Sequence, residues 1–394
     1  TFWGEPLVIE VSQLEANLRG DTGIISEKNA LLIDMQTRLE TTSLKQWLSL
    51  DLLEVTEGSA EFSGAIIVPT EGNAQLALTS TLEGVALDLP PPYGLSADES
   101  AALTINFSPG KKRQQLDFVI ENILSTYIEL QGKQFIGGRL ELSATAPVDL
   151  REVTEDVLLV GGQVSDLHWQ DWRQFIGRYL PEHADTPKEA MIDVVVDNLQ
   201  INKLSINGQN FSEITVGIRK KDDTLALSMA NDWMDGSIEI DESANKWRVD
   251  FAQLNLSGLL DNSDINLEGQ LNYNKELPSL EVSIDELIME EELWGNIFMN
   301  VNQIEGGIEA SNIHGELRNL KIGSETGARL SWYTKKEKYT EFSGDLQFDD
   351  FGDVLESWHY QRVVETRDSG VASVNLQWPG GIEDFNLESS VGEL

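Results

Sequence analysis

The segment 103–120 reads LTINFSPGKKRQQLDFVI and decides the class of the fold. Apolar and polar residues alternate on both sides of a Ser-Pro-Gly turn, and a period of two is typical of strands with one apolar face. In an antiparallel hairpin, facing residues have a constant summed number. The predicted pairs are Leu103 with Ile120, Ile105 with Phe118, and Phe107 with Leu116. This register places the large apolar side chains on one face.

The same alternation continues outward along the chain. Hairpins around 219–224 and 242–246 are predicted to pair Ile218 with Leu225, Val216 with Leu227, Ile214 with Met229, Ile240 with Val249, and Ile238 with Phe251. We expect these strands, with their neighbours around 76–78 and 265–267, to share one apolar surface. The residues predicted to line it are Leu76, Leu78, Leu103, Ile105, Phe107, Leu116, Phe118, Ile120, Ile214, Val216, Ile218, Leu225, Leu227, Met229, Ile238, Ile240, Val249, Phe251, Ile265 and Leu267.

Three short segments have helical spacing instead, each after a predicted strand. They are Thr42–Leu50, Asp166–Leu180 and Asp349–Tyr360, with N-caps at Thr42 or Ser43, at Asp166, and at Asp349 or Asp350. Their tryptophans Trp47, Trp172 and Trp358 are interpreted as core residues rather than ligand-stacking ones. The helices divide the chain into predicted segments 1–165, 166–348 and 349–394, the last one opening a further β segment.

A chain with roughly 20 strands of ordinary length would form a sheet on the order of 100 Å long. Three short helices cannot cover such a face. The predicted fold is therefore mostly β: a long, curved, twisted antiparallel sheet that forms an elongated groove with an apolar interior, plus about three short helices. The alternative is a sheet that folds over on itself as sandwiches or barrels.

Composition excludes several classes of function. The net charge is −39, so the bulk surface would repel nucleic acid. The absence of cysteine excludes disulfides, thiolate metal sites and cysteine nucleophiles. No stretch reaches the ~20 apolar residues of a membrane span, and no signal peptide is visible. Because the chain opens at Thr1 and stops at Leu394 in mid-pattern, we expect a monomeric fragment of a longer protein.

No catalytic or metal-binding motif is present. The four histidines, His168, His183, His314 and His359, form no metal-spaced pair, and the phosphate-loop and nucleophile-elbow motifs are absent. Carboxylates near 232–235 and 261–268 do not match a calcium loop. We expect no cofactor and no enzymatic activity.

Nine of the 28 basic residues gather at three predicted hairpin tips. They are Lys111, Lys112 and Arg113; Arg219, Lys220 and Lys221; and Lys335, Lys336 and Lys338. Polar turns that keep sheet edges apart are the simpler interpretation. The alternative is a basic rim that meets anionic lipid headgroups.

Three stretches carry a family resemblance. They are residues 80–92 (STLEGVALDLPPP), residues 344–355 (GDLQFDDFGDVL), and residues 374–380 (VNLQWPG) followed by Asp384, Phe385, Leu387 and Gly392. Together they resemble the AsmA-like superfamily, and within it the large YhdP-type proteins of Gram-negative bacteria. The acidity of this chain exceeds what that resemblance leads us to expect.

The resemblance implies a periplasmic protein, anchored in the inner membrane by parts absent here, whose β-groove moves phospholipid toward the outer membrane and supports its permeability barrier. It implies no catalytic residues. The expected partners are phospholipid acyl chains and, through the rest of the parent protein, the inner and outer membranes. Two alternatives stay open: a β-sandwich array for adhesion or carbohydrate binding, and a polysaccharide-active enzyme with two carboxylates.

Overall fold

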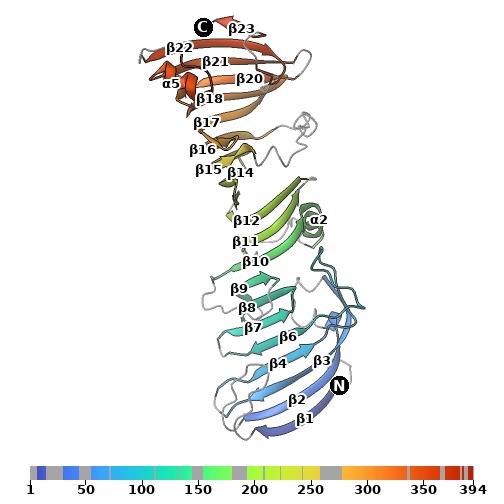
Figure 1. The fold of residues 1–394 in the computed structure, drawn as a ribbon. Coiled ribbons are helices and arrows are strands. Elements are labelled where there is room, and N and C mark those ends of the chain that lie inside the picture. The colour runs from blue at the N-terminus through green and yellow to red at the C-terminus, as the bar shows by residue number, and fades with distance from the viewer. Residues whose placement is uncertain are drawn as a thin grey trace. The chain divides into compact units, whose positions relative to one another are not determined.

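The structure of the chain is a computed structural model (Figure 1). It describes residues 7–14, 30–43, 55–70, 72–110, 112–132, 134–143, 154–179, 193–206, 209–221, 223–241, 243–257, 277–334, 338–363, 369–381, 384–385 and 389–393. The chain divides into two compact units, Thr1–Gly217 and Ile218–Leu394.

The described strands are β1 (Leu7–Leu14), β2 (Ala30–Glu40), β3 (Thr56–Val68), β4 (Gln75–Ser80), β5 (Val85–Leu87), β6 (Leu103–Ser108), β7 (Gln114–Ile120), β8 (Leu124–Gln131), β9 (Gln134–Leu142), β10 (Val157–His168), β11 (Asp193–Ile206), β12 (Gln209–Lys221), β13 (Thr224–Ala230), β14 (Met234–Asp241), β15 (Lys246–Asn255), β16 (Ser279–Met289), β17 (Glu292–Ile304), β18 (Gly307–Leu317), β19 (Leu320–Ile322), β20 (Ala328–Tyr333), β21 (Tyr339–Phe348), β22 (Gly370–Pro379) and β23 (Val391–Glu393). The longer helices are α2 (Trp169–Tyr179) and α5 (Phe351–Ser357).

In the first unit, strands β1, β2, β3, β4, β6, β7, β8, β9, β10 and β11 lie side by side in that order. The pairs are antiparallel up to β9, and β9–β10 and β10–β11 are parallel. Strand β5 pairs with the start of β3. Tight turns use residues that tolerate positive φ, such as Asn122 at +62° between β7 and β8.

In the second unit, strands β13, β14, β15, β16, β17, β18, β20, β21, β22 and β23 follow one another in order. Only β15–β16 is parallel among these pairings of the described strands. Strand β19 pairs with one end each of β18 and β21. The mostly β fold with one large sheet and few short helices is confirmed, and the sheet is mixed rather than purely antiparallel.

The strand directions define two sides in each unit. In the first unit, the connection 81–102, the turn 121–123 and helix α2 lie at the same strand ends. In the second unit, the turns 231–233 and 290–291 and helix α5 do so. We call these ends the helix side of each unit, and the opposite ends, which in the second unit carry turns such as 243–245 and 305–306, the turn side.

The predicted register of the 103–120 hairpin is confirmed, with Leu103 opposite Ile120, Ile105 opposite Phe118 and Phe107 opposite Leu116. The predicted register of the 238–251 hairpin is wrong by two residues.

In that second hairpin, Ile240 faces Trp247 and Ile238 faces Val249, and Phe251 faces Gly236. The turn is shorter than predicted because the Asp241 carboxylate accepts hydrogen bonds from the Ser243 hydroxyl at 2.7 Å and the Ala244 amide at 2.9 Å. No register is described for the pairs that join β12 to β13.

The structure contains two of the three predicted helices, and it describes only the first residues of the third. Helix α5 begins where predicted, with Asp350 as N-cap accepting from the Gly352 and Asp353 amides. Helix α2 is present, but β10 continues to His168, so Asp166 is a strand residue and not the N-cap. A helical turn covers 41–43, and the remainder of the predicted helix Thr42–Leu50, with Trp47, lies outside the described residues. The division at 165/166 and 348/349 stays a prediction.

Candidate functional site

The candidate site is the apolar face of the sheet, which the strand registers join across each unit. Residues that pair across a ladder point to the same face. In the first unit one such row crosses ten strands and consists of Val11, Ile33, Ile66, Leu76, Phe107, Leu116, Ile128, Gly138, Leu158 and Val194. The row contains no polar side chain.

A second row on the same face lies two residues away along each strand. Its members are Ile9, Met35, Gly64, Leu78, Ile105, Phe118, Thr126, Leu140, Val160 and Val196. Thr126 is its one polar member, and its buried hydroxyl has no hydrogen-bond partner. The two rows form a continuous apolar surface across the first unit.

The second unit repeats this arrangement. One row consists of Leu225, Ile240, Trp247, Leu280, Val301, Ala310, Leu330, Phe342 and Leu376. Further along the strands, a parallel row consists of Met229, Gly236, Phe251, Ile284, Ile297, Gly315, Ile322, Leu346 and Ala372. Between them lie Leu227, Ile238, Val249, Val282 and Met299.

The opposite face of the same strands is polar. Ala226, Glu239, Arg248, Glu281 and Asn300 form the adjoining row in the second unit. Arg248 pairs there with Glu239 at 3.3 Å and with Glu281 at 3.5 Å. A hydrogen bond from Lys246 holds the pKa of Glu281 below its usual range. The sheet therefore has one solvated face and one predominantly apolar face.

Protein covers the apolar face only in part. Leu116 and Ile128 are buried and form a cluster against which Ile105, Phe107 and Phe118 are half-buried. In the second unit most of the row from Leu225 to Phe342 is half-buried, Trp247 is 36% exposed, and Ala310 is buried in a cluster with Ile313 and Ala328. Continuous half-exposed apolar rows are unusual on a soluble domain and are typical of a binding surface.

Most predicted lining residues lie on these rows. Leu103 and Ile120 are buried beside them, and Ile214 is buried while Val216 and Ile218 are half-buried. Ile265 and Leu267 lie outside the described residues. Their role as a lipid lining stays a prediction.

Sequence reasoning missed several members of the rows. Periodicity alone does not include Gly64, Gly138, Gly236 or Gly315, which have no side chain to read. Leu280, Val282 and Ile284 alternate with Glu281 and Ser283, so this run can be predicted from sequence by the same rule.

The basic hairpin tips are less uniform than predicted. Arg113 is bound to Glu129 at 2.7 Å and to Glu155 at 2.9 Å, and these carboxylates raise its pKa. Lys112, Arg219 and Lys221 are exposed, as are Lys220 and Lys338. Lys111, Lys335 and Lys336 lie outside the described residues. The rim stays a prediction.

The polar face of the first unit holds a half-buried acid. Asp117 lies between Asn106 and Tyr127 in the strand register. Burial raises the pKa of Asp117. Burial also raises the pKa of Glu129, but hydrogen bonds from Arg113 and Tyr127 outweigh it, so the net pKa is below the usual range.

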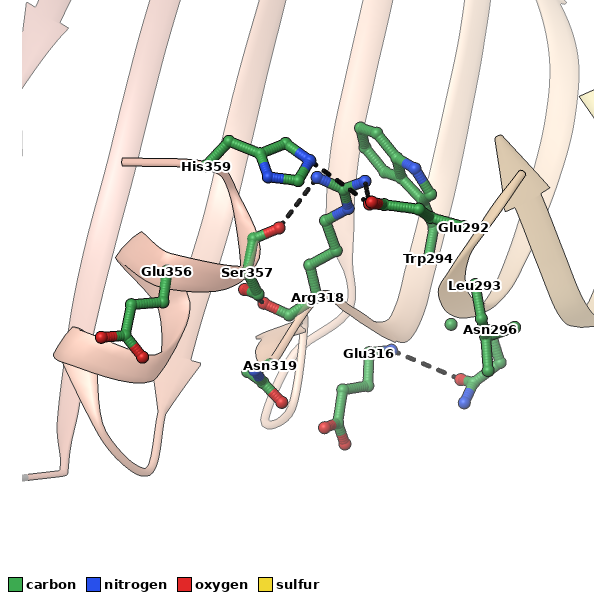
Figure 2. Close-up of a pocket in the computed structure, with 11 residues that line it drawn as sticks. Glu292, Leu293, Trp294, Asn296, Glu316, Arg318, Asn319, Glu356, Ser357 and His359 are labelled. Carbon is green, nitrogen blue, oxygen red and sulfur yellow. Dashed lines mark hydrogen bonds and ion pairs between the residues drawn. The ribbon is translucent and has the colours of Figure 1, made fainter. Parts of the chain in front are cut away.

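A pocket of about 580 Å³ opens at the helix side of the second unit (Figure 2). The Arg318 guanidinium forms part of the pocket wall. It donates a hydrogen bond to the Ser357 carbonyl at 2.8 Å and forms an ion pair with Glu292. It also lies 4.2 Å from the centre of the Trp294 ring. Trp358 packs edge-on against Trp294 at 5.3 Å.

These contacts tie helix α5 to the ends of β17 and β18. The buried Arg318 guanidinium is already paired with Glu292. We therefore interpret the residues around the pocket as the contacts that hold helix α5 in place. The signature stretch 374–380 is also structural: Trp378 is buried, donates to the Gly381 carbonyl at 2.8 Å and packs against Phe385.

Within the described part of the chain, no cluster of three or more acidic or histidine side chains is arranged to hold a metal ion. Among the same residues, no helix has the length and apolar character of a membrane span.

Comparisons with known proteins now bear on these features. No curated protein and no solved structure matches the chain. The sequence model of one family, described as YhdP protein, matches residues 2–394. The chain therefore belongs to the YhdP family, whose members are envelope proteins related to lipid transport.

Proposed function

We propose that this chain is a non-enzymatic segment of a phospholipid conduit in the periplasm. In this proposal the parent protein is anchored in the inner membrane, and the conduit supplies the outer membrane and supports its permeability barrier. The observation that carries the proposal is the unbroken apolar rows, such as Leu225 to Leu376, in which every residue except Ala310 is left partly exposed by protein.

The energetics favour acyl chains as the occupant. Burying one methylene group contributes ~0.8 kcal/mol, so a chain that covers even part of one row contributes several kcal/mol. A row in which only the Trp247 indole can form a hydrogen bond recognises its ligand mainly by shape and apolarity. Such a surface accepts successive lipids equally well, as a conduit requires.

Family membership and the polar face of the sheet support the same proposal. Ion pairs such as Arg248–Glu239 favour contact of the polar face with water, which leaves the apolar rows to bind lipid. The described strands of each unit form one sheet rather than separate repeats with filled cores, which argues against a sandwich array for adhesion.

The test is extraction of phosphatidylethanolamine with a fluorescent acyl chain from sucrose-loaded vesicles, followed by sedimentation. The proposal predicts fluorescence in the supernatant in proportion to added protein. Fluorescence that stays with the vesicles would contradict it. Calorimetry with an oligosaccharide series provides the comparison, since heat of binding there would favour the carbohydrate-binding alternative.

A further inference from the structure

The two sides of the sheet differ in the second unit, and the difference concerns where a lipid headgroup can lie. On the helix side, apolar-face residues are well covered: Met234 is 5% exposed, Leu254 8% and Leu287 7%. These three residues pair with one another across β14, β15 and β16. The apolar surface is therefore closed by protein at that side.

At the turn side of the same strands the apolar face is open. Ile240, Trp247 and Leu280 pair across β14, β15 and β16. Ile240 and Leu280 are half-buried, and Trp247 is 36% exposed. Exposure of the apolar face thus rises from the helix side to the turn side along β14, β15 and β16.

Helix α5 lies at the same side, against the ends of β17, β18 and β21. Phe351 of α5 packs on Phe348, with ring centres 5.1 Å apart, and the Arg318 guanidinium binds the last carbonyl of the helix. The first unit is built alike, since Trp172 of α2 packs edge-on at 6.1 Å against Tyr93, which is 1% exposed. In each unit, a described helix and its aromatic contacts therefore lie at the helix side.

The two sides of the second unit also differ in their charged residues. The helix side of the second unit carries exposed carboxylates, namely Glu290, Glu291, Glu292, Glu316, Asp349, Asp353 and Glu356. Its cations Arg318, Lys321 and Arg362 each pair with a carboxylate. A phosphate group would be repelled there.

The turn side has a mixed charge, with exposed Arg219 and Lys221 beside Asp223. Aromatic packing occurs there too, where Trp378 meets Phe385, but it lies at β22, near the end of the unit. Leu225 of β13 and Val301 of β17 continue the row at the turn side and are half-buried too, so the open turn side extends over β13 to β17.

We infer that phospholipid in the second unit lies across β13 to β17 with its headgroup at the turn side and its chain ends toward the helix side. From Leu280 to Leu287 the strand rises ~23 Å, at about 3.3 Å per residue. One leaflet of a bilayer hydrocarbon core is ~15 Å thick, so an acyl chain fits within this span. The inference rests on the proposed function and adds the orientation of the ligand to it.

The absence of cysteine from the chain makes a direct test available. Ala244→Cys places a thiol in the exposed turn at one end of β14, and Asp232→Cys places one in the exposed turn at the other end. Both variants are incubated with vesicles that contain phosphatidylethanolamine bearing a maleimide on its amine. Rates are divided by the rate with N-ethylmaleimide, which corrects for the intrinsic reactivity of each thiol.

We expect Ala244→Cys to react with the headgroup probe at least about tenfold faster than Asp232→Cys, because bound lipid has a high local concentration at one side only. A phospholipid with a maleimide at the end of its acyl chain should give the reverse order. Equal rates, or a reversed order with the headgroup probe, would overturn the orientation.

A third variant, Val249→Cys, distinguishes this failure from failure of the proposed function. Val249 lies on the central apolar row, so its thiol should react with the chain-end probe whichever way the lipid is oriented. If Val249→Cys reacts while the two turn variants do not differ, the orientation is wrong and the conduit stands. If Val249→Cys fails to react as well, no lipid is held and both proposals fall.

Discussion

Leu227→Asp is the substitution that most sharply probes the apolar face of the second unit. Leu227 is half-buried on the central row, between Met229 and Leu225 along β13 and opposite Ile238. Its neighbour Ser228 is exposed, faces the polar side and lies opposite Ser237. Ser228→Asp is therefore a matched control, with the same charge one residue away on the other face.

The expected magnitude follows from the half-burial of Leu227. Full burial of a leucine side chain contributes ~1.5–3 kcal/mol, so lipid contact with the exposed half contributes about 1 kcal/mol. Desolvating the new carboxylate against an acyl chain costs a further ~1–3 kcal/mol. The sum of about 2–4 kcal/mol corresponds to a roughly 30- to 1,000-fold loss of local affinity.

Folding should survive the change. The protein loses only the contacts of the buried half of Leu227, ~1 kcal/mol, against a typical domain stability of about 5–15 kcal/mol. The assay is photo-crosslinking of a phospholipid with a photoreactive acyl chain, with the crosslinked peptide from β13 quantified by mass spectrometry. Circular dichroism melting confirms folding.

Leu227→Asp should lose the β13 crosslink, and Ser228→Asp should keep it. Equal crosslinking in the two folded variants would refute the assignment of the apolar row as the lipid-contacting face.

Further predictions concern single residues away from that row. Asp117→Asn should raise the thermal midpoint of unfolding at pH 7 but not near pH 3. A carboxyl group whose pKa is raised in the folded state lowers the free energy of unfolding once the pH exceeds that pKa. It has no such effect below its unfolded pKa of about 3.9. A gain that persists near pH 3 would contradict this cause. Arg318→Met should lower urea stability by ~1–3 kcal/mol, because the Ser357 carbonyl loses its donor, whereas an unchanged urea midpoint would exclude the tie to α5. Reversing Arg219 and Lys221 to Glu should lower capture of phosphatidylglycerol more than of phosphatidylethanolamine, with the gap shrinking at high salt; a salt-independent effect would leave these residues as solubilising turns.

Part of this fold could be predicted from sequence because side-chain alternation reports the face of each strand directly. The register predicted for the hairpin Leu103–Ile120 agrees with the structure, because its Ser-Pro-Gly turn fixes the length of the loop. The register predicted for the 238–251 hairpin differs from the structure by two residues. A shift of two keeps every side chain on its face, so periodicity cannot detect it, and only the turn around Asp241 decides the register.

Other features leave no trace in the local pattern. Alternation carries no strand direction, so the parallel pairing of β15 with β16 could not be read from it. Helix α5 could be predicted from its spacing and its Asp350 cap, but its seat on Trp294 and Arg318 depends on residues distant in sequence.

The central claim is that the apolar rows hold phospholipid, and native mass spectrometry of the chain tests it most directly. The chain would be expressed in the periplasm of a Gram-negative bacterium and purified without detergent. The account predicts mass additions of whole phospholipids, released by collisional activation and identified by their fragments. A spectrum of the folded chain without bound lipid, unchanged after incubation with phosphatidylethanolamine vesicles, would contradict it.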